Sequence, residues 1–207
     1  MIVGVDPSLT ATGIYCNGAA GLVRSKPRAV EGDFIDLTIL RCDEIMDKMD
    51  EWLLVSTPGR ESVFEFFLEG PMFTIDSSKT GSHLLEMGIW YGCFFRRFRV
   101  GGNTVRIVNP SVLKKFISGK GNTRKDAIPL IAYKRWGAEF ESDPGYDKVH
   151  AYCLERLGHA VYDGSFDLTT AKRRGGRSRK TQSAANAEGG TRKVQVRRNR
   201  RAYANSE

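Results

Sequence analysis

The chain has 207 residues, of which 41% are hydrophobic and 27% are charged, a balance typical of a soluble domain with or without a tail. No apolar run approaches the roughly 18 residues that span a bilayer. The four cysteines form no C-x-x-C pair, which argues against a zinc site and against a secreted disulfide framework. The strand-like N-terminus lacks the pattern of a signal peptide, so we expect a protein of the reducing cytoplasm.

The positive charge is concentrated at the C-terminus. Residues 172–207 contain twelve Lys or Arg and two Glu, a net charge of +10, whereas the other 171 residues have a net charge of −2. Large apolar residues are almost absent from this segment, so it cannot bury enough surface to offset its chain entropy. We expect a folded domain over residues 1–165 and a basic, disordered tail over residues 166–207. The tail either solubilises the protein or binds phosphates non-specifically, with an affinity that falls steeply with salt.

Short apolar segments predict strands, and apolar residues at helical spacing predict helices. In chain order we expect strands over residues 1–5, 11–16 and 19–23, a helix over 36–55, a strand over 63–68, a helix over 77–98, a strand over 104–108, and helices over 110–117, 124–136 and 147–161. Three strands in a meander, followed by alternating strands and helices, predict an α/β fold. We expect a mixed five-stranded sheet with helices on both faces.

Four residues are candidates for chemistry. Asp6 ends the first strand and Glu69 ends the fourth, while Asp147 and His150 lie three apart at the start of the last helix and therefore share one face. The first and fourth strands are expected to be neighbours, which would bring Asp6 close to Glu69. Carboxylates that converge without a basic neighbour repel one another, and a hard cation such as Mg²⁺ or Mn²⁺ would relieve that repulsion. Such ions can activate a water for phosphodiester hydrolysis.

Each of these residues also has an ordinary structural interpretation. Asp6 stands in an Asp-Pro-Ser turn, and Glu69 could cap a turn or helix. Asp147 could be a first-turn acid that interacts with the helix dipole, and a single histidine such as His150 is more often structural than a ligand. The ordered set is more specific than any one member.

The set resembles the RuvC-type Holliday-junction resolvases of the RNase H-like nuclease superfamily, and the resemblance covers most of residues 1–161. It rests on the opening segment Ile2-Val3-Gly4-Val5-Asp6-Pro7-Ser8-Leu9-Thr10-Ala11-Thr12-Gly13, on Glu69, on Asn109-Pro110-Ser111-Val112-Leu113-Lys114-Lys115, on Gly119-Lys120-Gly121-Asn122-Thr123-Arg124-Lys125-Asp126-Ala127, and on Asp147-Lys148-Val149-His150-Ala151. Small phage-encoded members look most similar, which would place the protein in the host cytoplasm. The basic tail is an addition to the family's core.

The resemblance implies a homodimer that binds branched DNA, such as a four-way junction, and nicks it with Mg²⁺ or Mn²⁺. By motif position, Asp6, Glu69 and Asp147 would be catalytic metal ligands. Lys114 and Lys125 would contact DNA near the scissile phosphate, and Phe73, or Met72 beside it, would be a junction wedge. Lys120 and Arg124, next to the Gly-rich turn, could hold a phosphate. Trp90 would face the second subunit.

One position departs from the family pattern. Many members have a second acid where this chain has His150, so His150 would be either a catalytic metal ligand that favours Mn²⁺ or the base that deprotonates the attacking water. Asp143 is a reserve candidate for the missing acid, on a loop with Pro144 and Gly145.

Three other functions stay open. An actin-like or sugar-kinase-like ATPase shares the expected sheet but needs two such domains and a longer chain. A catalytically weakened RNase H-like DNA-binding protein would fit the histidine at position 150. A less selective endonuclease of the same fold, cutting flaps or forks, would fit equally well.

Overall fold

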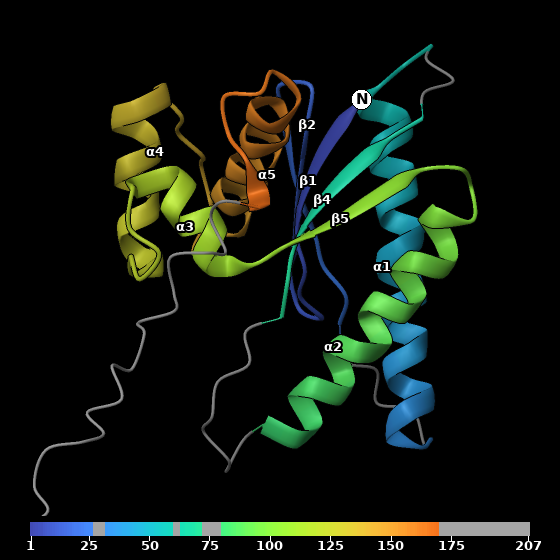
Figure 1. Cartoon of the computed structure of the whole chain (residues 1–207). Helices are drawn as coiled ribbons and strands as arrows, with labels where there is room; N and C mark the ends of the chain where they lie inside the picture. Colours follow the sequence, from blue (N-terminus) through green and yellow to red (C-terminus); the bar gives the residue numbers. More distant parts are fainter. Residues whose placement is uncertain (27–31, 60–62, 72–79, 170–207) are drawn as a thin grey trace, which may run out of the picture. The chain divides into compact units, whose positions relative to one another are not determined.

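The computed structural model describes residues 1–26, 32–59, 63–71 and 80–169 (Figure 1). Its elements in chain order are β1 (Ile2–Asp6), β2 (Thr12–Cys16), β3 (Ala19–Val23), α1 (Phe34–Ser56), β4 (Glu65–Glu69), α2 (Thr80–Phe94), a π-helical turn (Phe95–Arg99), β5 (Thr104–Val108), α3 (Pro110–Ser118), a 3₁₀ turn (Lys125–Ala127), α4 (Ile128–Trp136) and α5 (Asp147–Tyr162).

The five strands form one mixed sheet in the order β3-β2-β1-β4-β5. The first three are antiparallel, with Asn17 and Gly18 at positive φ in the turn between β2 and β3, as expected for a two-residue hairpin. Strands β4 and β5 are parallel to β1. The expected fold class is therefore confirmed, including the pairing of the first strand with the fourth.

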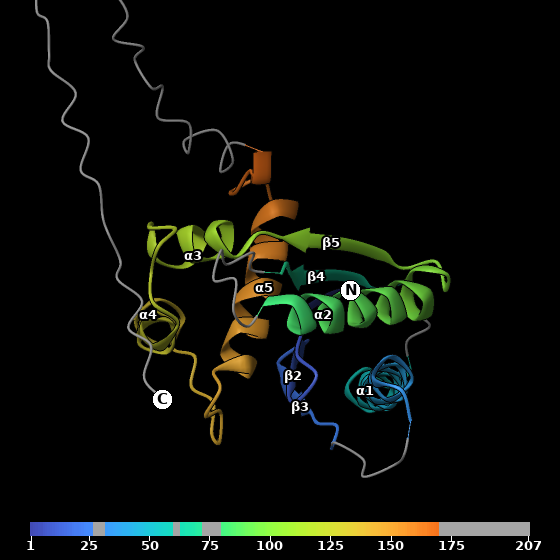
Figure 2. The ribbon, with the colours of Figure 1, turned by 90° about the horizontal axis from the view of Figure 1, so that it is seen from below.

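Helices cover both faces of the sheet, with α1 and α2 on one side and α3, α4 and α5 on the other (Figures 1 and 2). The alternation of side chains along the central strands explains this arrangement. Phe66 and Leu68 of β4 belong to the core under α1 and α2, whereas Phe67 belongs to the opposite core. None of the helices in the described segments has the length and hydropathy needed to cross a membrane.

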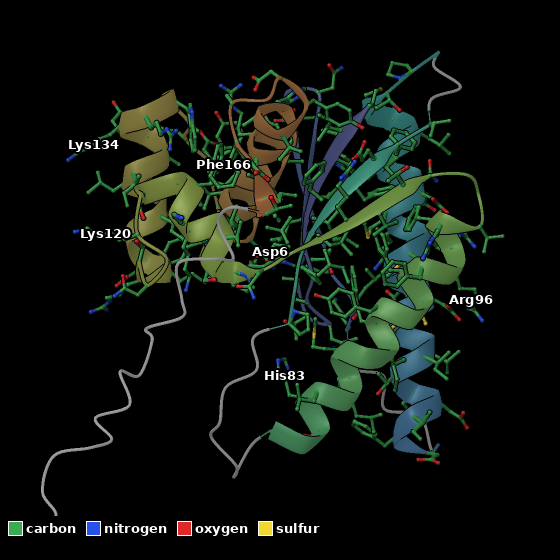
Figure 3. All side chains as sticks on the ribbon, viewed as in Figure 1. Asp6, His83, Arg96, Lys120, Lys134 and Phe166 are labelled. Atoms are coloured by element: carbon green, nitrogen blue, oxygen red, sulfur yellow. The ribbon has the colours of Figure 1, made fainter. Side chains whose placement is uncertain are left out.

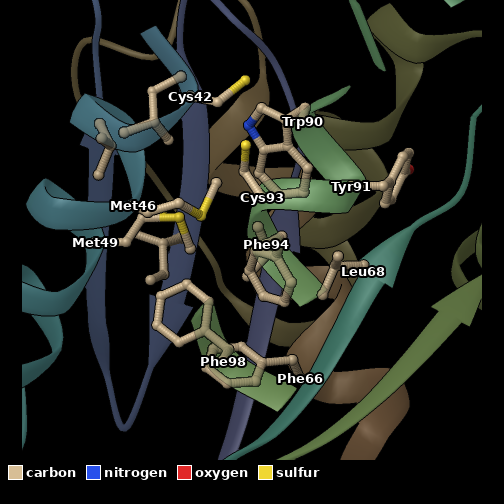
Figure 4. Close-up of a cluster of buried hydrophobic side chains, with 14 of the residues drawn as sticks. Cys42, Met46, Met49, Phe66, Leu68, Trp90, Tyr91, Cys93, Phe94 and Phe98 are labelled. Carbon is tan, nitrogen blue, oxygen red and sulfur yellow. The ribbon is translucent and has the colours of Figure 1, made fainter. Parts of the chain in front are cut away.

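The core under α1 and α2 is rich in aromatic side chains (Figure 4). Trp90 is fully buried there and stacks on Phe94, with ring centroids 5.2 Å apart and an interplanar angle of 15°. The Phe94 ring in turn meets Phe66 of β4 edge-on. The expectation that Trp90 faces a second subunit is therefore wrong, because the indole is buried in the core of its own chain.

The second core lies between the sheet and α3, α4 and α5. It extends beyond α5, since Phe166 packs edge-on against Phe116 of α3 and Leu168 is partly buried against the same core. The division of the chain into a domain over residues 1–165 and a tail over 166–207 stays a prediction, because residues 170–207 lie outside the described segments.

Two helices differ from their expected form. The segment expected as a helix over 124–136 begins with a 3₁₀ turn at Lys125–Ala127, and α4 starts only at Ile128. Pro129 lies in the first turn of α4, where its missing N–H is tolerated. The helix expected over 77–98 is described from Thr80, and its last residues form the π-helical turn instead of continuing α2.

Helix α5 lies unusually close to the sheet because glycines face it. A Cβ atom on Gly4 of β1 would lie 1.9 Å from the carbonyl oxygen of Ala151, and one on Gly13 of β2 would lie 2.1 Å from that of Asp147. Real Cβ atoms do not approach backbone this closely. These two glycines therefore let the N-terminal half of α5 rest directly on β1 and β2.

We expect Gly4→Ala to destabilise the fold by about 3 kcal/mol or more, because α5 would have to move off the sheet. Gly92→Ala is the matched control, since nothing lies within 4 Å of the Cβ position on the exposed side of α2. In a helix that change should stabilise by roughly 0.5–1 kcal/mol. Urea unfolding followed by circular dichroism measures both. Equal stabilities for the two variants would contradict the close packing of α5.

Candidate metal centre and nucleic-acid cleft

Two acids meet at one edge of the sheet because β1 and β4 are parallel neighbours. Val5 pairs with Leu68 in the register of the two strands, so Asp6 and Glu69, the next residue of each, lie side by side. His150, from the first turns of α5, completes the group. One ligand atom from each of the three residues lies within 4.8 Å of the others.

His150 points its Nδ1 atom into this group. That atom lies 3.1 Å from Oε2 of Glu69 and 3.6 Å from Oδ2 of Asp6, and the side chain is only 2% exposed. The opposite ring nitrogen, Nε2, is buried without a hydrogen-bond partner among the described residues. The imidazole is thus fixed with one nitrogen toward the two carboxylates.

Asp147 is connected to this group by a shared ion pair with Lys125. The Lys125 ammonium lies 3.2 Å from Oδ1 of Asp147 and 3.5 Å from Oδ2 of Asp6. The structure therefore brings Asp6, Glu69 and His150 together directly, with Asp147 across the Lys125 side chain. The reserve candidate Asp143 caps α5 instead. Its two carboxylate oxygens accept hydrogen bonds from the backbone N–H groups of Lys148 and Val149.

The surroundings shift the pKa values of Asp6 and Glu69 in opposite directions. Burial and then the charge of Glu69 raise the pKa of Asp6 well above its usual value, against the opposing charge of Lys125. Burial acts to raise the pKa of Glu69 as well, but the hydrogen bond and charge of His150 outweigh it and lower that pKa. Lys125 is also partly buried, yet the charges of Asp6 and Asp147 raise its pKa, so its ammonium stays charged.

The donor set fits a hard divalent cation. Three carboxylates face one ammonium, which leaves excess negative charge, and Oδ2 of Asp6 is buried and accepts no hydrogen bond from the described residues. Carboxylate oxygens suit Mg²⁺ and Mn²⁺, and an imidazole nitrogen suits the transition metals better than Mg²⁺. Asp6, Glu69 and His150 could hold such an ion directly.

The group lies in a cleft of about 370 Å³. One wall is the loop after Asp6, which is held in place because Leu9 accepts hydrogen bonds from Ser25 at 2.6 Å and Arg41 at 2.9 Å. The remaining lining comes from the ends of several elements: Glu69, Gly70, Pro71, His83, Leu84, Glu86, Met87, Tyr91, Pro110, Lys114, Lys125 and His150. An opening of this kind lets a phosphate approach the acids beside two lysines.

The residues expected to bind DNA divide into two sets. Lys114 and Lys125 line the cleft. Lys120 is exposed at the outer edge of the α3–α4 region, away from Asp6 (Figure 3), and Arg124 is engaged in an exposed ion pair with Asp126. The expected wedge, Phe73 or Met72, lies outside the described residues.

Tyr91 is a site residue that the sequence did not single out. Its hydroxyl donates a hydrogen bond to the backbone carbonyl of Glu69, and its ring lines the cleft. Burial and the charges of Glu69 and Asp6 raise its pKa, so the hydroxyl stays a donor. In the sequence, Tyr91 is one of four aromatic residues at positions 91, 94, 95 and 98, a pattern that suits a core position equally well.

Replacing Asp6 by asparagine should stabilise the metal-free protein. A carboxyl whose pKa is raised on folding contributes stability below the usual aspartate pKa of about 3.9, and that stability is lost as the pH rises toward the raised value. The neutral amide of Asp6→Asn avoids this loss and the repulsion by Glu69. At pH 7 in EDTA we expect a gain on the order of 1 kcal/mol or more, and a smaller gain near pH 4.

Thermal and urea unfolding at the two pH values measure this effect. Asp126→Asn is the matched control, because it removes one exposed carboxylate that pairs with Arg124, and it should change stability by less than about 0.5 kcal/mol. A loss of stability in Asp6→Asn at pH 7 would show that the Asp6 carboxylate is not under electrostatic strain.

Comparison with known proteins addresses the fold. No protein-family model matches the sequence, and the search of curated proteins finds no match. Among solved structures, RuvC of Thermus thermophilus superposes with a TM-score of 0.52 at 18% sequence identity, over 78% of this chain and 94% of that chain. The structure of T. thermophilus RuvC in complex with a Holliday junction substrate gives a TM-score of 0.55 at 18% identity, over 78% and 93% of the two chains. The chain therefore has the fold of the RuvC-type resolvases, as its sequence motifs predicted.

Proposed function

We propose that this protein is a structure-selective endonuclease that resolves Holliday junctions or related branched DNA by metal-dependent phosphodiester hydrolysis. The observation that carries the proposal is the grouping of Asp6, Glu69 and His150 within 4.8 Å, at the edge of a RuvC-type sheet and in a cleft that also holds Lys114 and Lys125. A bound Mg²⁺ or Mn²⁺ ion would there activate a water and stabilise the leaving oxygen.

Different residues of the chain would bind the metal ion and the DNA. Asp6, Glu69 and His150 would hold the ion, with Asp147 joining once Lys125 no longer occupies its carboxylate. Lys114 and Lys125 would bind the phosphate that is cut, and Lys120 and Arg124 would contact DNA further from the centre. The basic tail would add contacts that depend on salt but not on base sequence.

A homodimer fits this activity because a four-way junction is resolved by two nicks. A two-fold dimer would present two copies of the centre to two DNA strands of like sequence. Phe73 or Met72 would act as the wedge that holds the junction open. These assignments follow from the resemblance to the resolvases.

A cleavage assay tests the proposal. We expect the parent protein to make paired nicks in a labelled four-way junction only when Mn²⁺ or Mg²⁺ is present. Asp6→Asn should lower the rate by more than about 100-fold, since even changes beside a metal's direct ligands cost ~10–100-fold. Asp126→Asn, with its exposed carboxylate, should cut at the parental rate.

The other outcomes separate the alternatives. Junction binding without divalent-dependent nicks would identify a catalytically weakened DNA-binding protein. Equal cutting of junctions, flaps and forks would identify a less selective endonuclease. Parental cutting by Asp6→Asn would overturn the assignment of the centre.

His150 can act as a ligand or as a base, and the two metals help to distinguish these roles. If it is a ligand, His150→Ala should lower cleavage more strongly with Mn²⁺ than with Mg²⁺, because imidazole favours the softer ion. If it is the base, the rate should fall by roughly 10²–10⁴-fold with both ions. Single-turnover rates at saturating metal measure this, and rates equal to the parent with both ions would eliminate both roles.

A further inference from the structure

The Lys125 ammonium places a positive charge within the acidic group. Lys125 belongs to the 3₁₀ turn before α4 and lines the cleft, and its ammonium contacts Asp6 at 3.5 Å and Asp147 at 3.2 Å. The side chain is 47% exposed, so a ligand in the cleft can reach it. Lysine has a flexible stem and a compact charge, which lets it exchange one anion for another without a change in backbone.

The ammonium and the expected metal need the same oxygen. Lys125 contacts Oδ2 of Asp6, and that same atom faces Nδ1 of His150 at 3.6 Å. Two cations that share one carboxylate oxygen repel each other strongly in a partly buried site. A divalent ion between Asp6, Glu69 and His150 would therefore have to act against the charge of Lys125.

Lys114 offers a contrast in the same cleft. It lines the opening, but its ammonium forms no ion pair with any residue of the described segments. Lys114 can therefore bind a phosphate without leaving an acid unpaired, whereas Lys125 must release two carboxylates to do so.

We propose that Lys125 is a displaceable counter-ion that keeps metal affinity low until a DNA phosphate takes its ammonium. This inference rests on the proposed function, since it assumes the metal centre and the phosphate site described above. When the ammonium moves to a phosphate, Asp6 and Asp147 become available to the metal. DNA and metal then raise each other's affinity, because such a coupling is reciprocal, and the free protein is protected from cutting at the wrong place.

Metal binding without DNA tests the proposal directly. Calorimetric titration of the metal-stripped full chain with Mn²⁺ should show at least about tenfold tighter binding for Lys125→Met than for the parent. Lys125→Arg keeps the charge and should stay close to the parent. Lys134→Met, on the outer edge of α4 (Figure 3), removes one charge far from the centre and should change the affinity less than about twofold.

The same titration separates failure of this inference from failure of the proposed function. Asp6→Asn should abolish Mn²⁺ binding at this site. Equal affinity in the parent and Lys125→Met, with Asp6-dependent binding retained, would overturn the counter-ion role and leave the metal centre standing. Absence of Asp6-dependent Mn²⁺ binding in every variant would overturn both.

Junction binding measures the coupling. Saturating Ca²⁺, a hard cation that prefers oxygen ligands, should tighten binding of a labelled four-way junction in the parent and in Lys134→Met. In Lys125→Met the factor should be at least about threefold smaller, because no ammonium is released to the DNA. Fluorescence anisotropy provides the measurement, and an undiminished factor in Lys125→Met would contradict the proposal.

Discussion

The central constraint of the structure is that two carboxylates lie side by side at the edge of a buried sheet. Asp6 and Glu69 end two neighbouring parallel strands, and both are withdrawn from water, so their repulsion is only weakly screened. Burial and the charge of Glu69 accordingly raise the pKa of Asp6. His150 and Lys125 relieve it in part. A site that stays under-neutralised in this way is poised to bind cations.

The constraint is imposed by backbone packing and not by the acids alone. Gly4 and Gly13 remove the side chains that would keep α5 at an ordinary distance from the sheet. The first turns of α5 therefore reach the ends of β1 and β2, which brings Asp147 and His150 beside Asp6. In this fold the glycines are as necessary to the centre as its polar atoms, because one added methyl group at either position would displace the helix that carries half of the site.

Local pattern explains what could be predicted from the sequence. Apolar strands that end in Asp6 and Glu69, and a helix that begins at Asp147, are visible as periodicity. The meander followed by strand–helix alternation predicts a mixed sheet in which the first and fourth strands are neighbours. The pattern does not show which acid Lys125 contacts, because the partners Asp6 and Asp147 are far apart in sequence. It also cannot assign Trp90, since a large aromatic residue on an apolar helix face suits a core and an interface equally well.

The two cores explain how the fold supports a strained centre. Val3, Val5, Phe66 and Leu68 anchor β1 and β4 on one face, and Phe67 anchors β4 on the other. The strands that carry the opposed carboxylates are therefore those fixed from both sides. Their ends cannot move apart to relieve the repulsion, so relief has to come from groups around them, such as His150 and Lys125. Under the proposal made above, a metal ion bound to Asp6 would be the alternative to the Lys125 ammonium at one and the same oxygen atom.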